Sequence, residues 1–369
     1  MKFFGITHHS YLLKFGILIV GCLTIGFLIT EHVEAPREAV NIFPRPVVAK
    51  RPLSIYAVGN INLAGTETTS WFAAGAEPGF AALLRELGTA DLAFGNLDCQ
   101  MIRNPQPEGR LQAFSAAPAS AEALANAGFD LLSTANELSS EFDAEALTET
   151  ISNLRRVGIR HAGTGRTIDE AYEPAEIERH GWRIALFGVT AVFDHNFFGL
   201  PSQSSLACAN ITRLSRQIAL ARQRFDLILI SYHGGEADGT APSAEARFFA
   251  QRCIEAGADI VLGHHPHAPQ TFELYRNRLI FYSLGDFIGN NANRNASDQW
   301  ADRSLAARIF VSSQEATGEL KFSVERVPLL LNKLPHRAEG KEAEAILAQL
   351  QPSGLPSDKV QPLGRYSER

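Results

Sequence analysis

The feature that most constrains the fold is an alternation of short apolar segments with longer stretches of helical length, which begins at Leu53. Short apolar runs bounded by polar or small residues are typical of buried strands, and the longer stretches between them are typical of helices. Strands are expected at LSIYAV (53–58), DLAFG (91–95), DLLST (130–134), RIALFGVT (183–190), DLILISY (226–232) and ADIVLG (258–263). Helices are expected near 79–88, 119–127, 143–156, 209–223 and 243–256. The alternation predicts an α/β fold with a mainly parallel central sheet.

The last part of this region follows a different pattern. TFELYRNRLIFYSL (271–284), ARIFVSS (307–313) and ELKFSVERV (319–327) have no helical stretch between them. They are expected to pair as antiparallel strands, which completes one domain over residues 53–335. Residues 336–369 contain a short Ala/Glu helix and a Pro/Ser/Gly end, and are expected to form a charged, peripheral tail.

Composition excludes some classes of function. The chain has a formal net charge of -6 and 20% charged residues, with no basic excess. A nucleic-acid partner is therefore not expected. The four cysteines are scattered and form no CxxC pair, which argues against a zinc ribbon.

The N-terminus predicts a membrane anchor. Residues 15–30, FGILIVGCLTIGFLIT, carry no charge, and the apolar segment extends back to residue 11. Residues 11–30 are then about long enough to cross a bilayer. Lys2 and Lys14 place the N-terminus (1–14) in the cytoplasm and the body outside the cell membrane, with the Pro-rich residues 31–52 as a linker. A cleaved signal peptide and a buried core helix are the alternatives.

Polar side chains follow five of the expected strands. In open α/β sheets, ligands gather at the carboxyl ends of the strands. Turn formation alone accounts for single Asn or Asp residues at such places, and a lone histidine is commonly a core residue. Delivery of amides, carboxylates and imidazoles from several strand ends to one edge instead indicates a binding site. The residues are Asn60, Asn62, Asn96, Asp98, Asn136, Glu137, His233, His264, His265 and His267.

This set of side chains indicates a divalent metal site. Imidazole, carboxylate and amide oxygen are ligands of Mn, Fe and Zn. With enough ligands for two ions, such a site could clamp a phosphoryl or carbonyl centre. The cluster His264-His265-Pro266-His267 is the strongest part of the pattern, because Pro266 restrains the backbone between two histidines.

Several motifs resemble the CapA family of poly-γ-glutamate capsule biosynthesis proteins, whose fold is similar to calcineurin-like metallophosphoesterases. The resemblance covers about residues 53–290. It is carried by AVGNIN (57–62), GNLDC (95–99), the block from Phe129 to Arg166, ISYHGG (230–235) and GADIVLGHHPHAPQTFELYRNRLIFYSLGDF (257–287). It implies a layered α/β sandwich of metallophosphoesterase type.

The resemblance also implies roles for individual residues. The metal ligands implied are Asn60, Asp98, Asn136, His233, His265 and His267, with His264 beside them. His264 and Glu137, a neighbour of the position where the family has a histidine, are the candidate catalytic residues. Asn62, Asn96 and Asp286 are expected at the edge of the site.

The chain departs from the family pattern at four places. Asn60 stands where the family usually has Asp, which removes a negative charge beside any cation. Asp98 replaces Glu, and Asp286 replaces Asn. Glu137-Leu138 replaces Asn-His, and Leu138 can neither donate a proton nor stabilise an oxyanion. These changes predict that one of two metal positions is weak or empty and that catalysis is impaired.

Two classes of function therefore remain open. One is a membrane-anchored protein of capsule or surface polymer synthesis and export, with weakened or absent catalysis. The other is an active dinuclear-metal hydrolase or transferase that acts on an extracellular polymer or a phosphorylated precursor. The partners that the resemblance implies are the polymer or its precursor and other capsule-synthesis membrane proteins.

Overall fold

The computed structural model describes residues 50–64, 72, 77–104, 114–193, 206–289, 300, 302–314, 317–332 and 334–351. All of them belong to the second of two compact units, Val48–Arg369. The expected anchor at 11–30 and nearly all of the linker at 31–52 lie outside the described residues. Within the part of the chain that is described, no helix is long and apolar enough to cross a membrane.

The first sheet is mixed. Its strands are β1 (Leu53–Ile61), β2 (Leu92–Leu97), β5 (Leu131–Ser133), β6 (Arg160–Ala162), β13 (Asp286–Ile288), β14 (Arg303–Ser313), β15 (Leu320–Leu331) and β16 (Pro335–Arg337). The strand order is β16-β15-β14-β1-β2-β5-β6, and β13 pairs with the end of β1. Strands β1, β2, β5, β6 and β13 are parallel, and β14, β15 and β16 continue the sheet by antiparallel pairing.

The second sheet has the order β11-β12-β10-β9-β8-β7. Its strands are β7 (Ala175–Arg179), β8 (Trp182–Thr190), β9 (Leu227–His233), β10 (Ile260–His264), β11 (Phe272–Tyr275) and β12 (Arg278–Phe281). Strands β8, β9, β10 and β12 are parallel, whereas β7 and β11 pair with their neighbours in the antiparallel sense. A short parallel pair, β3 (Gln100–Met101) and β4 (Ser115–Ala116), lies apart from both sheets.

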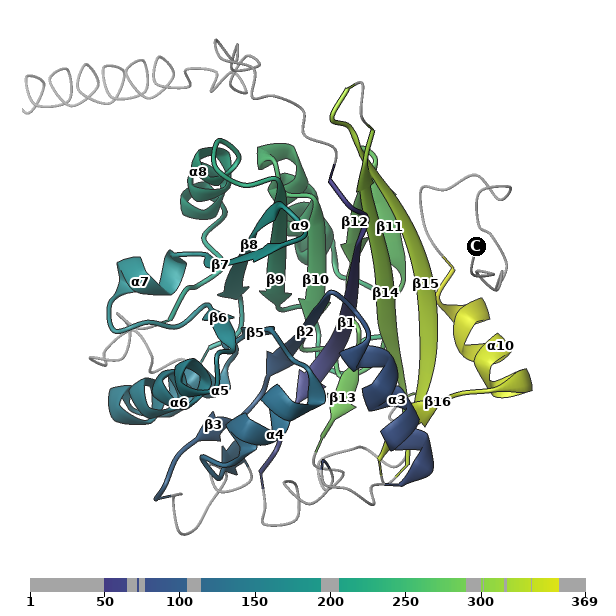
Figure 1. The fold of residues 1–369 in the computed structure, drawn as a ribbon, viewed down its shortest axis with the longest axis horizontal. Coiled ribbons are helices and arrows are strands. Elements are labelled where there is room, and N and C mark those ends of the chain that lie inside the picture. The colour runs from purple at the N-terminus through teal and green to yellow at the C-terminus, as the bar shows by residue number, and fades with distance from the viewer. Residues whose placement is uncertain are drawn as a thin grey trace, which may run out of the picture. The chain divides into compact units, whose positions relative to one another are not determined.

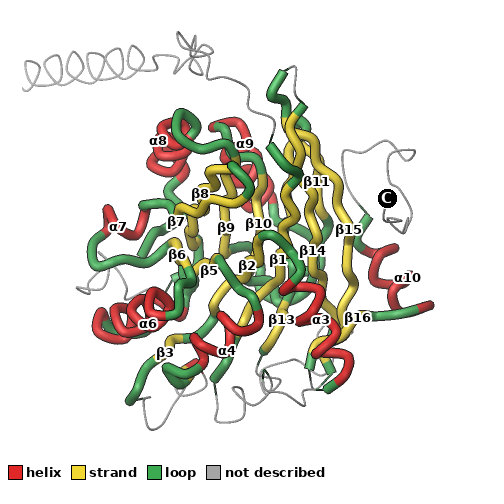
Figure 2. Tube along the Cα trace, viewed as in Figure 1, coloured by secondary structure: helices red, strands yellow, loops and turns green. Residues whose placement is uncertain are grey.

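Helices pack around the two sheets. They are α3 (Pro78–Gly88), α4 (Ser120–Ala127), α5 (Leu138–Glu141), α6 (Ala144–Arg156), α7 (Ile168–Tyr172), α8 (Ile211–Ala221), α9 (Ala244–Ala256) and α10 (Gly340–Gln349). Helices α3 and α4 share a core with β1 and β2, and α8 and α9 share another with β8, β9 and β10 (Figure 1). The strands lie inside and most of the helices at the periphery (Figure 2).

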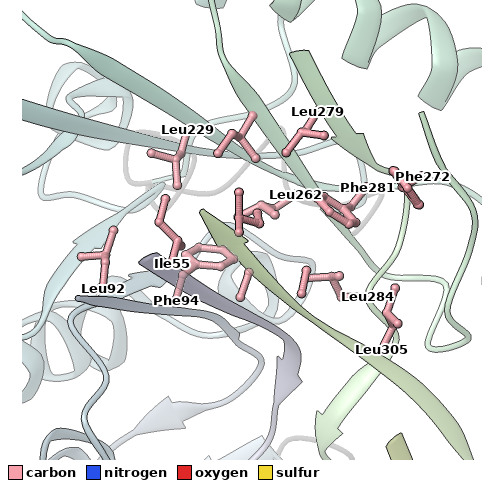
Figure 3. Close-up of a cluster of buried hydrophobic side chains, with 14 of the residues drawn as sticks. Ile55, Leu92, Phe94, Leu229, Leu262, Phe272, Leu279, Phe281, Leu284 and Leu305 are labelled. Atoms are coloured by element: carbon pink, nitrogen blue, oxygen red, sulfur yellow. The ribbon is translucent and has the colours of Figure 1, made fainter. Parts of the chain in front are cut away.

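The main core lies between the sheets. Ile55 and Phe94 from the first sheet face Leu229 and Leu262 from the second, as Figure 3 shows. Neighbouring side chains on the central strands point outward to the helices, so both faces of β1, β2, β9 and β10 are buried and their sequences are continuous apolar runs. The expected α/β fold and antiparallel hairpins are confirmed. The expected mainly parallel central sheet is confirmed in part, because the strands form two mixed sheets whose inner strands are parallel.

Local signals set the helix boundaries. Asp143 accepts a hydrogen bond from the Ala146 N–H at 2.8 Å and so caps α6, as the side chain of Ser243 caps α9.

The chain after residue 335 differs from the expected peripheral tail. Strand β16 pairs with β15, and Ile346 and Leu350 reach the core between the sheets, so apolar contacts hold this segment in place.

Candidate metal centre

The carboxyl ends of strands from both sheets meet at one place. On the first sheet, Asn60 pairs with Asn96 of β2 and with Asp286 of β13. On the second sheet, His233 at the end of β9 pairs with His264 of β10. The Asn96 Nδ2 atom lies 3.3 Å from the His233 Nδ1 atom, so polar side chains of the two sheets are in direct contact.

Three side chains converge to form a candidate metal centre. The Nε2 atom of His233 lies 2.5 Å from one oxygen of Glu137, and the Nδ1 atom of His265 lies 3.5 Å from the other. One ligand atom from each residue lies within 4.8 Å of the other two. Two imidazoles and one carboxylate form a donor set used by Zn and non-haem Fe sites, which leave further coordination positions for water or substrate.

The backbone positions these side chains at some cost. Glu137 directly precedes α5, and the Ser139 hydroxyl donates to the Thr134 carbonyl at 2.6 Å and ties this turn to β5. In the histidine cluster, His265 has φ = 97° and His267 has φ = 57°. Positive φ angles are strained for residues with a side chain and concentrate at functional sites.

The electrostatics favour the protonation states that bind metal. Burial lowers the pKa of His233, although the Glu137 carboxylate opposes this shift. Burial would raise the pKa of Glu137, but the adjacent His233 and His265 outweigh it and hold that pKa well below its usual range. A neutral imidazole and an ionised carboxylate are the forms that act as metal ligands.

The buried donor atoms fit a cation. The His233 Nε2 and His265 Nδ1 atoms are shielded from solvent, and neither makes a hydrogen bond of good geometry to a described residue. Buried polar atoms are nearly always satisfied by a protein partner, a water or an ion, and a bound cation is one partner that suits two imidazole nitrogens. Both face the Glu137 carboxylate, and a divalent cation bound at this place would have all three side chains as ligands.

A second polar group lies beside this cluster. The Asp286 Oδ1 atom lies 2.8 Å from the His267 Nδ1 atom and accepts a hydrogen bond from Asn60 Nδ2 at 3.1 Å. The Asn60 Oδ1 atom in turn accepts from Asn96 Nδ2 at 3.0 Å. The Asp286 charge raises the pKa of His267 to about 10, against the effect of burial. The structure thus places Asn96 and Asp286, expected at the edge of the site, together with Asn60, which the sequence implied as a metal ligand.

Other expected site residues make different contacts. The Asn136 amide donates to the Leu97 carbonyl at 2.7 Å and accepts from the Ser139 backbone N–H at 3.1 Å, so the side chain supports the turn. The Asn62 side chain accepts from the Ala64 N–H at 2.9 Å. Asp98 is buried, and its Oδ1 atom has no hydrogen-bond partner in the described part of the chain. Burial, reinforced by nearby carboxylates, raises the pKa of Asp98 well above its usual range.

His264 does not lie among the candidate ligands. It follows Leu262 on the inward face of β10, and its ring centroid lies 5.7 Å from that of Phe94. Its side chain is fully buried, and burial lowers its pKa well below the usual range. This interior position differs from the catalytic position that the sequence implied.

Sequence reasoning did not anticipate the place of Glu137. The sequence implied a catalytic role for it, whereas the structure brings its carboxylate between His233 and His265 as a candidate ligand. A carboxylate next to Asn136, directly after a strand, was the available signal. The orientation of the turn decides which of the two side chains faces the histidines.

The chain is similar in sequence to known proteins of capsule synthesis. Residues 54–291 match the family described as "Bacterial capsule synthesis protein PGA_cap". The capsule biosynthesis protein CapA of Bacillus anthracis is 29% identical over 210 residues, which are 55% of this chain and 51% of that protein. The PGA biosynthesis protein CapA of Bacillus subtilis is 26% identical over 170 residues, which are 46% of this chain and 45% of that protein. The chain therefore spans about half the length of the curated relatives it matches.

The chain is also similar to a third relative and to a solved structure. A probable polyglutamine synthesis accessory protein of Mycobacterium tuberculosis is 24% identical over 210 residues, which are 53% of each chain. The crystal structure of TT1561 of Thermus thermophilus aligns with a TM-score of 0.39 and 11% identity over 75% of this chain and 99% of that chain. The family match covers well over half of the chain. The chain belongs to the bacterial capsule synthesis protein family.

Proposed function

We propose that the protein acts in the synthesis or export of a surface polymer of the polyglutamate type. The family match and the printed names of the relatives support this proposal. Residues 11–30 anchor the chain in the cell membrane, with the N-terminus inside and the body outside. The partners are the polymer or its precursor and other membrane proteins of capsule synthesis.

The observation that carries the chemical part of the proposal is the convergence of Glu137, His233 and His265. These three side chains hold a divalent Mn, Fe or Zn ion. A bound ion of this kind supplies Lewis acidity at a phosphoryl or carbonyl centre. His233, at the end of β9, and Glu137, after β5, would hold the ion from the two sheets, and His265 would add a ligand from the loop after β10.

We propose that hydrolysis at this centre is weakened or absent. Leu138 cannot transfer a proton, and Glu137 is committed to the two histidines. His264 is fully buried against Phe94 and is not among the three converging side chains. Loss of a general acid typically reduces a rate by about 10² to 10⁴. The fold would then serve mainly to bind the polymer or a partner enzyme.

The retained donor set favours a second candidate function, an active metal-dependent hydrolase or transferase of metallophosphoesterase type. The purified full-length protein, supplied with Mn²⁺, separates the two candidates on a phosphomonoester and on polyglutamate. Turnover that Glu137→Gln abolishes would support the active enzyme. If the wild type turns over substrate no faster than Glu137→Gln does, the result would support a binding protein.

The biological role is tested in the native host. Deletion of the gene should reduce surface polymer, and the wild-type gene should restore it. Glu176→Gln changes an exposed carboxylate paired with Arg224 and should restore polymer as well as the wild type. If the metal centre is needed, Glu137→Gln should fail to restore it. Unchanged polymer after deletion would refute the role.

A further inference from the structure

A layer of polar side chains lies between the apolar core and the candidate metal centre. The core in Figure 3 includes Phe94, Leu229 and Leu262, which face inward from three strands. Because inward positions recur at every second residue of a strand, the next inward residue on each of these strands is polar. The same holds on β5 after Leu131. The members of this polar layer are Asn96, Ser133, Ser231 and His264.

We infer that this polar layer binds ordered water, and that one water bridges Ser133 of the first sheet to Ser231 of the second. All four side chains are buried, with 0% exposure. The atoms that make no hydrogen bond within the described ranges are Asn96 Oδ1, Ser133 Oγ, Ser231 Oγ and both ring nitrogens of His264. Buried polar groups are nearly always hydrogen-bonded, and a buried water typically makes about three such bonds. The inference goes beyond the proposed function and holds whether or not the centre binds a metal ion.

The glycine at residue 188 brings the two serines close to each other. A Cβ atom added to Gly188 would lie 2.9 Å from the Ser133 Oγ atom, so this hydroxyl reaches across to the second sheet. Gly188 pairs with Ser231 on the neighbouring strand, and neighbouring strands lie about 4.8 Å apart. The two hydroxyls do not bond directly to each other. They therefore lie within reach of one bridging water.

The other two members connect the layer to the metal centre. Asn96 pairs with Ser133 in the first sheet, and His264 pairs with His233 in the second. The Asn96 Nδ2 atom lies 3.3 Å from the His233 Nδ1 atom, and the His264 ring centroid lies 5.7 Å from that of Phe94. Water in this layer would thus support the strand end that carries a candidate ligand.

The distribution of charge favours water over an ion in this layer. None of its four side chains is a carboxylate, so a buried cation between them would have no counter-charge. The Asp98 carboxylate follows Asn96 by two residues, and its pKa responds to the charges of Glu137, His267 and Asp286. Asp98 therefore lies with the other carboxylates of the metal centre. Counter-charges for a cation are found at that centre and not in the layer.

Serine-to-alanine variants of the full-length protein give the test a sign. Each change removes one oxygen atom and leaves the carbon packing intact. If water bridges the two hydroxyls, Ser133→Ala and Ser231→Ala should each lower the midpoint of thermal unfolding by about 2–4 °C. The double variant should lower it by less than the sum, because the second change removes one end of a bridge that is already broken.

Ser304→Ala is the matched control. Ser304 is also 0% exposed, and its hydroxyl donates to the Leu284 carbonyl at 2.7 Å, so its loss should lower the midpoint as well. An unchanged or higher midpoint for Ser133→Ala and Ser231→Ala, beside a lower one for Ser304→Ala, would overturn the inference, because removal of an unpaired buried hydroxyl is not destabilising. Additive losses in the double variant would overturn the shared water.

A crystal structure of the full-length protein, at a resolution that shows ordered water, gives the direct result. We expect a water within hydrogen-bonding distance of both Ser133 Oγ and Ser231 Oγ. Direct bonds from both hydroxyls to protein groups, or an anomalous signal from an ion between them, would overturn the inference. Loss of metal from Glu137→Gln leaves these expectations unchanged, so the water layer and the proposed metal centre are tested separately.

Discussion

Replacing Gly59 with alanine should displace the strand that carries Asn60. A Cβ atom at residue 59 would lie 1.9 Å from the Gly285 carbonyl oxygen and 2.7 Å from its carbon. Both atoms belong to the backbone, so no side-chain rotation relieves the clash. The same carbonyl accepts the Asn60 N–H at 3.0 Å, and this bond would also be lost.

The expected cost follows from these contacts. Overpacking a core typically costs about 1–3 kcal/mol, and a lost hydrogen bond adds about 1 kcal/mol. We therefore expect Gly59→Ala to lower the free energy of unfolding by about 3 kcal/mol. At about 2 °C per kcal/mol, which suits a large domain, the unfolding midpoint should fall by about 6 °C. Weaker metal binding should accompany this, since Asn60 and Asp286 flank the centre.

Thermal unfolding followed by circular dichroism measures this effect. Gly88→Ala is the matched control, because a Cβ atom there meets its nearest atom, the Ala127 carbonyl oxygen, at an ordinary 3.6 Å. The free energy of unfolding of the Gly88→Ala control should stay within about 1 kcal/mol of that of wild type. Equal midpoints for Gly59→Ala and Gly88→Ala would refute the close approach of the two backbones.

Three further predictions test the core, the pH dependence and the metal centre. Leu262 lies in the core between the sheets, and Leu262→Ala should lower the free energy of unfolding by about 2–5 kcal/mol in a denaturation experiment. Phe248 is 60% exposed, and Phe248→Ala should change it by less than about 0.5 kcal/mol. Equal effects would contradict the assigned core. Burial raises the pKa of Asp226, but hydrogen bonds from Arg183 outweigh it and hold the pKa below its usual range. The stability that the Asp226 carboxylate contributes is thus complete above its pKa in the unfolded chain, near 4, and is lost as the pH falls. The difference in free energy of unfolding between wild type and Asp226→Asn should therefore narrow from pH 6 to pH 3. A constant difference would contradict this. Mn²⁺ at about 100 times its dissociation constant should stabilise wild type by about 2.7 kcal/mol, and Glu137→Gln should lose this gain; an equal gain in both would exclude Glu137 as a ligand.

Parts of this architecture follow from sequence pattern alone. Polar residues lie at the ends of β1, β2, β5, β9 and β10. The strand pattern predicted that they share one edge of a sheet, and the structure brings several of them together. The division into two sheets does not follow from pattern. Ile55 and Leu229 lie on opposite sheets, yet both occupy apolar runs of the same kind. Which strands pair depends on long-range contacts that no local period encodes.

The detailed roles of the site residues depend on tertiary orientation. Asn136 and Glu137 are adjacent, and only the turn before α5 decides that the Asn136 amide binds the Leu97 carbonyl while the Glu137 carboxylate meets the histidines. Similarly, His264 and His265 are neighbours, but His264 continues the inward face of β10 and His265 adopts a positive φ angle beyond the strand end. Side-chain type predicts the chemistry of such a site, whereas backbone geometry selects its members.

Glu137, His233 and His265 should bind a divalent metal ion. Anomalous diffraction from crystals grown with Zn²⁺, recorded above and below the zinc edge, locates the ion directly. The expected result is a peak in contact with His233 Nε2, His265 Nδ1 and the Glu137 carboxylate, absent in crystals of Glu137→Gln. A map without a peak at these three side chains, at a zinc concentration that saturates the protein in solution, would contradict the claim.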